Sequence, residues 1–220
     1  MSHLIMKLKA FDLKENFITF PFYIILNPFK GFNDLKYEKR GRTYFPIVMM
    51  ILLSLFAICD ELYKGFVLSG YYTKDRYINT PYTILISLGP VLLFVIANWS
   101  ITAITNGIGK LKEIFMVYAY ALYPKILLST IGLMISNFII VDEIAFSTFF
   151  YSFGTVAFAF YLFIGLIIIH EYSFPKAIAM ILLTVLSMTI IVFILALFMS
   201  LINEVFMFFY TIYTEIRLKI

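Results

Sequence analysis

Five long stretches of the chain are apolar and nearly free of charge, and each approaches the length that a helix needs to cross a lipid bilayer. That length is about 20 residues for about 30 Å of hydrocarbon. Backbone polar groups in lipid must bond within their own segment, and strand-like alternation is absent, so each stretch is expected to be a helix. The stretches cover approximately residues 45–59, 81–105, 114–140, 144–169 and 176–201. The sequence therefore predicts an all-α fold, a polytopic membrane bundle of about five transmembrane helices.

The composition requires lipid contact. Of the 220 residues, 62% are hydrophobic and 14% are charged, whereas soluble proteins have about 45–50% apolar and about 25% charged residues. One soluble core could not hide this excess. The single cysteine, Cys59, leaves no internal disulfide or cysteine-based metal site. The net charge of +4 indicates orientation and contact with anionic lipid, and no nucleic-acid partner is expected.

Lysine and arginine flank the predicted spans unequally. Eleven of them lie before the first span or in the loops after the second and fourth spans, and five lie on the opposite side. Because basic residues collect on the cytoplasmic side, the count predicts a cytoplasmic N-terminus, an outside C-terminus and a plasma-membrane location. We divide the chain into a cytoplasmic N-terminal segment with a basic amphipathic helix (1–44), a five-span domain (45–202) and a C-terminal interfacial tail (203–220).

Interfacial amphipathic helices are expected at both ends of the chain, before and after the five spans. Asn27 is a good N-cap, Pro28 follows at the first helical position, and apolar residues then recur at helical spacing among basic ones. A helix of this kind lies on an anionic leaflet with its apolar face down. The tail also lines up aromatic residues on one face. Both segments are interpreted either as anchors or as partner-docking surfaces, with contact residues Phe29, Phe32, Lys36, Arg40, Phe206, Tyr213 and Arg217.

The sequence contains no visible catalytic constellation. His3 lies at the start of the chain, and His170 stands alone at a span end, where an interfacial role is expected because no second histidine completes a zinc motif. Gly107, Gly109 and Lys110 form a Gly-x-Gly-Lys turn, but it lacks the preceding strand and the spacing of a phosphate-binding loop. We therefore expect no enzyme activity, no cofactor and no metal.

Lys125 is the one basic residue deep inside a predicted span, directly after Pro124. A charge at that depth is costly unless it snorkels, reaches water or finds a partner. Counting about 1.5 Å per residue from the cytoplasmic side places four polar residues near its level. They are Ser54, Asn98, Tyr161 and Thr184. Two interpretations stay open: an intramembrane polar site around Lys125, or a lysine that snorkels or hydrogen-bonds to Asn98 between helices.

Three blocks carry a family resemblance. They read ANWSIT over residues 97–102, NGIGKLKEI over 106–114 and YAYALYP over 118–124. Together they resemble the bacterial branch of the Yip (Ypt-interacting protein) domain family, and so do segments at both ends, residues 27–32, 36–41 and 210–217. The residues of the family motif are Asn98, Trp99, Gly107, Gly109, Lys110, Tyr120 and Pro124.

The resemblance implies five membrane helices and a cytoplasmic N-terminus. Eukaryotic members act in vesicle trafficking and contact Rab-type GTPases, but this sequence lacks their acidic Asp-Leu-Tyr-Gly-type N-terminal element, so GTPase binding is not carried over. Bacterial members resemble accessory membrane proteins and often accompany sugar-transport genes. Lys125 departs from the uncharged residue that the family pattern would have after the Tyr-Pro step.

Three functions follow as hypotheses. The first is a non-enzymatic accessory or scaffold protein that engages another membrane complex, such as the permease or ATPase of an ABC-type sugar importer. The second is a small transporter or channel-like bundle with its polar site around Lys125. The third is a membrane-shaping or trafficking-type protein. An intramembrane enzyme ranks last, because no acid, base, nucleophile and metal set converges in the sequence.

Overall fold

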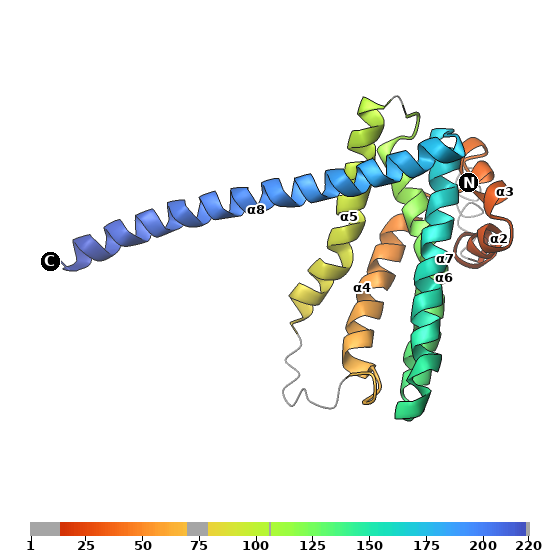
Figure 1. The fold of residues 1–220 in the computed structure, drawn as a ribbon, viewed down its shortest axis with the longest axis horizontal. Helices are drawn as coiled ribbons and strands as arrows, with labels where there is room; N and C mark the ends of the chain where they lie inside the picture. Colours follow the sequence, from red (N-terminus) through yellow and green to blue (C-terminus); the bar gives the residue numbers. More distant parts are fainter. Residues whose placement is uncertain (1–13, 70–78, 106, 219–220) are drawn as a thin grey trace, which may run out of the picture.

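The computed structural model describes residues 14–69, 79–105 and 107–218, so His3 and the ends of both terminal segments lie outside the described residues. The described residues contain helices and no strand. Among the described residues, five helices are long and apolar enough to cross a membrane, with the fourth beginning in a short 3₁₀ turn (Figure 1). They are α4 (Phe45–Tyr63), α5 (Thr80–Ile104), α6 (Leu111–Ser136), α7 (Ile144–His170) and α8 (Phe174–Leu218). The predicted all-α bundle with about five spans is confirmed.

Two short α-helices lie before α4 in the part of the N-terminal segment that the structure describes. After a π-helical turn (Glu15–Thr19), α2 (Phe20–Leu26) and α3 (Pro28–Tyr37) are separated only by Asn27. Asn27 has non-helical backbone angles and Pro28 occupies the start of α3, as the sequence predicts. The Asn27 side chain makes no capping hydrogen bond. The backbone carbonyl of Asn27 instead accepts a hydrogen bond from the Gly31 N–H at 2.8 Å.

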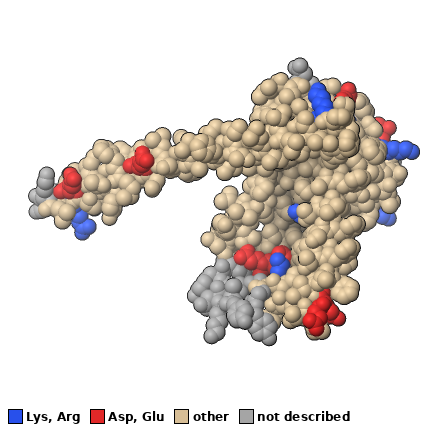
Figure 2. All heavy atoms as spheres, viewed as in Figure 1, with Lys and Arg blue, Asp and Glu red and all other residues tan. Residues whose placement is uncertain are grey.

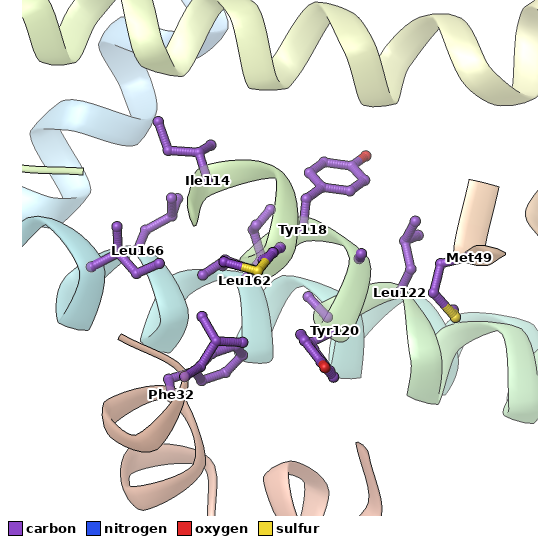
Figure 3. Packing of buried hydrophobic residues seen from close by; sticks show 14 of the residues in the cluster. Phe32, Met49, Ile114, Tyr118, Tyr120, Leu122, Leu162 and Leu166 are labelled. Carbon is purple, nitrogen blue, oxygen red and sulfur yellow. The ribbon is translucent and has the colours of Figure 1, made fainter. Parts of the chain in front are cut away.

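The core lies where α6 packs against α7, α4 and α5, with α3 packed on α7 and α2 on α6 (Figure 3). Small residues allow α6 and α7 to approach closely. A Cβ added at Gly165 would come 2.4 Å from the Val117 side chain, and one at Gly154 would come 3.2 Å from the Lys125 carbonyl oxygen. In the same core, Tyr120 stacks on Phe45 with ring centroids 4.0 Å apart.

The apolar face of α3 packs onto the bundle. Phe32 and Leu35 are buried in the core, whereas Phe29 is exposed. This corrects the expectation that Phe32 contacts lipid or a partner. The physical reason is that an apolar helix face is satisfied equally by lipid and by a neighbouring apolar helix, and α7 is adjacent.

α8 is one continuous helix of 45 residues. Its first part packs on α5, and its remainder projects away from the other helices (Figure 1). The structure therefore shows no break at the expected boundary between the fifth span and the tail, and the interfacial position of the tail stays a prediction. No glycine or proline occurs between residues 177 and 218, so nothing in the sequence interrupts the helix.

The end of the bundle at which α4 finishes is held by a compact polar cluster. The Asp60 carboxylate pairs with Lys64 at 2.6 Å and accepts a hydrogen bond from the Tyr151 hydroxyl at 2.5 Å. The Gly65 N–H donates to the Ser136 hydroxyl at 2.9 Å. In the view of Figure 2, most charged side chains lie at the two ends of the bundle and near the far end of α8. On the face seen there, the surface between these ends is almost free of charge, as lipid contact requires.

Candidate functional site

A buried polar network joins α5, α7 and α8. The Asn98 amide donates to the Thr184 hydroxyl at 3.0 Å, and the Asn98 amide oxygen lies 3.1 Å from His170 Nε2. The other ring nitrogen, Nδ1, accepts from the Gly109 N–H at 3.2 Å. Because Gly109 can only donate, the ring must carry its proton on Nε2 and donate to Asn98. All three side chains are almost completely buried.

The Gly-x-Gly-Lys turn packs against this histidine. A Cβ added at Gly109 would lie 2.5 Å from His170 Cε1, and one at Gly107 would lie 2.3 Å from a Thr102 methyl group. Tyr172 stacks on the His170 ring with centroids 4.9 Å apart. The two glycines therefore allow the backbone to contact an imidazole ring, which joins the α5–α6 connection to the end of α7.

A second polar group ties α3 to the same end of α7. Lys36 Nζ donates to the Ile168 carbonyl at 3.1 Å and pairs with Glu171 at 2.6 Å. The Tyr37 hydroxyl donates to the same carboxylate at 2.5 Å. Hydrogen bonds from Lys36 and Tyr37 lower the pKa of Glu171, which adopts a left-handed backbone with φ 55°. The positive charge of Lys36 also interacts favourably with the negative end of the α7 dipole.

The five residues expected at one membrane depth are not all brought together. Asn98 and Thr184 meet, but the Tyr161 hydroxyl donates to the Ile25 carbonyl and the Ser54 hydroxyl to the Met50 carbonyl. The Lys125 ammonium lies 5.4 Å from the Phe158 ring centroid. The depth count treated all helices as parallel, whereas α8 crosses α5 (Figure 1). Thr184 therefore reaches the end of α7, where His170 lies.

The other motif residues divide between the core and the surface. Tyr120 and Pro124 are buried within α6, Trp99 is about half exposed at 47%, and Lys110 is exposed. Sequence reasoning missed the role of His170, which was assigned to the interface. Its bond to Asn98 joins residues 72 positions apart, so no local pattern could have revealed it. The described residues include no cluster of three or more His, Cys, Asp or Glu that could hold a metal ion.

The fold and these contacts define a multi-pass helical membrane protein whose buried polar groups fasten helix ends together. The model of the Yip1 domain matches residues 22–198, most of the chain, and the chain belongs to that family. The Yip resemblance of the motif blocks is thereby confirmed. Neither the comparison with curated proteins nor that with solved structures gave a match.

Proposed function

We propose that this protein is a non-enzymatic accessory or scaffold protein that binds another membrane-protein complex. The observation that carries the proposal is the exposure of α8. Only Ala177 and Thr184 of this helix are buried. At about 1.5 Å per residue the helix is roughly 67 Å long, about twice the hydrocarbon thickness of a bilayer. A helix of this length reaches well beyond its own bundle, as a docking arm would.

The far part of α8 has the chemistry of a contact surface. Phe206, Phe209 and Tyr213 are all more than 60% exposed, and Arg217 follows in the last turn. Aromatic residues and arginine are over-represented among the residues that dominate protein–protein binding energy. This surface supports the partner-binding role that the sequence proposed for the tail.

The first partners to test are the permease and the ATPase of an ABC-type importer, because bacterial proteins of this type resemble accessory proteins encoded near sugar-transport genes. We place the complex in the plasma membrane with the N-terminus in the cytoplasm. The excess of basic residues at one set of span ends supports this orientation.

The test is affinity purification of the tagged protein from its own host in mild detergent, followed by quantitative mass spectrometry. The test variant is Phe206→Ala/Tyr213→Ala. Its matched control is Phe146→Ala/Phe153→Ala, which removes two exposed aromatic rings from α7. We expect one membrane complex to co-purify in a fixed ratio, to be lost with the first pair and to be retained with the second. Recovery of this chain alone in several detergents would contradict the proposal.

A small transporter is the second candidate, favoured by Lys125. Its side chain is half-buried beside Phe158, and no described carboxylate lies within ion-pair distance. An unpaired cation at such a position is a common mark of a substrate or ion path. The membrane-shaping hypothesis has less support, because the burial of Phe32 and Leu35 removes much of the apolar wedge that α3 would insert.

A further inference from the structure

Beyond the proposed function, we propose that the protein binds a phosphate group in a basic cavity next to the start of α6. The cavity has a volume of about 390 Å³ and lies between residues 38–44, the end of α3 and the beginning of α6. Its charged lining consists of Lys36, Lys39, Arg42, Lys110, Lys112 and Glu113.

The charges around this cavity are strongly unbalanced. Lys36 is already paired with Glu171. The other four cations form no ion pair within the part of the chain that the structure describes. The single carboxylate, Glu113, points at the backbone, where it accepts a hydrogen bond from the Lys110 N–H at 2.9 Å. Four cations without an ion pair in the described residues therefore line one cavity, and Glu113 is the single carboxylate among its lining residues.

Gathering like charges in this way is unfavourable unless an anion balances them. Lysine and arginine together match phosphate, because arginine offers two parallel N–H groups and lysine a compact charge. α6 also begins at Leu111, so its positive dipole end adds to the same field. The floor is apolar, since Leu35 and Met116 line the cavity and are buried.

The size of the cavity suits a small phosphate compound or the headgroup of one lipid. Ligand cavities commonly measure about 300–1,000 Å³. An apolar floor below a cationic rim suits an anionic phospholipid, and the rim alone suits a soluble phosphate. Both sources share the phosphate group, and the experiment separates them.

The experiment uses the full chain purified in a mild zwitterionic detergent. In one arm the protein is placed in nanodiscs of phosphatidylcholine containing a small fraction of phosphatidylglycerol, and bound lipid is measured by native mass spectrometry after release into detergent. In the other arm inorganic pyrophosphate is titrated into the detergent-solubilised protein by calorimetry. The variant Arg42→Gln/Lys112→Gln changes two exposed cavity cations. The control Lys30→Gln/Lys176→Gln removes the same charge from exposed positions that do not line the cavity.

We expect at least one probe to bind wild type and the control pair equally, and to bind the cavity pair about tenfold or more weakly, the loss of roughly one charge-assisted contact. Selective retention of phosphatidylglycerol identifies a lipid headgroup, and saturable pyrophosphate binding identifies a soluble phosphate compound. Equal losses in both pairs would show general charge attraction and overturn the proposal. Failure of both probes to bind wild type would overturn it as well.

Discussion

Replacing Asn98 by leucine tests whether the polar network fastens the helices. Leucine branches at the same carbon but has neither polar atom, so both contacts of the amide are lost. Thr184 keeps a partner, because its hydroxyl still donates to the Met180 carbonyl at 2.7 Å. His170 does not: its Nε2–H loses Asn98, and the ring cannot exchange tautomers while Gly109 donates to Nδ1.

The expected cost follows from that one orphaned donor. A buried donor left without a partner costs about 1–3 kcal/mol. Hydrogen bonds between membrane helices contribute on average about 0.6 kcal/mol to stability, because the polar groups of separated helices also find partners. The full penalty applies to His170, because its side chain is only 2% exposed and water cannot replace the lost partner. We therefore expect Asn98→Leu to lower the free energy of unfolding by about 1–3 kcal/mol.

The assay is unfolding by sodium dodecyl sulfate in mild detergent micelles, followed by far-ultraviolet circular dichroism. Fluorescence of Trp99, the single tryptophan, would respond directly to its changed neighbour and is the poorer probe. The matched control is Ser54→Ala, because the Ser54 hydroxyl bonds only to a carbonyl of its own helix in the described contacts. The control should stay within about 0.5 kcal/mol of wild type. If Asn98→Leu stays within the same limit, the network does not hold the helices and the reasoning is refuted.

Three further changes follow from the structure. Gly65→Ala would place a Cβ 1.7 Å from the Ser136 carbonyl oxygen, so circular dichroism should show a loss of about 1–3 kcal/mol, while Gly89→Ala, with no atom within 4 Å, should be neutral or stabilising by up to about 1 kcal/mol. The pKa of Glu171 is lowered by its α3 partners, so its contribution to stability should be complete above the ordinary glutamate value and disappear as the pH falls through the lowered one. In thermal unfolding scans Glu171→Gln should remove this acid dependence; an unchanged pH profile would contradict it. Lys125→Met should leave the fold and partner recovery intact if the protein is a scaffold, and loss of cellular function with partner recovery unchanged would favour a transport site.

The spans could be predicted from the sequence because lipid contact is a local property of each segment. Hydropathy placed α5 at approximately 81–105, against Thr80–Ile104 in the structure. The same local signal could not predict whether an apolar helix face contacts lipid or another helix. Phe32 and Phe29 carry equal apolar character, yet one is buried against α7 and the other is exposed.

The candidate site was only partly predictable, because its contacts depend on how helices cross. Asn98 was named from the motif and from its depth, and Thr184 from depth alone. Their contact exists, but it forms at the end of α7 rather than beside Lys125. Counting residues gives the distance along each helix and says nothing about the tilt of α8, which decides which level of the bundle Thr184 reaches.

The two proposed activities occupy separate parts of the molecule and can be tested independently. The basic cavity lies at the end of the bundle where α7 finishes. Lys36 lines the cavity and also donates a hydrogen bond to a carbonyl in the last turn of α7. The separate network of His170 and Asn98 at the same end of α7 reaches Thr184, which lies in the first part of α8. The exposed arm around Phe206 lies beyond every contact of that network. Changes of Arg42 and Lys112 should therefore weaken phosphate binding without loss of the co-purified partner, and loss of both together would show that the cavity and the arm act as one site.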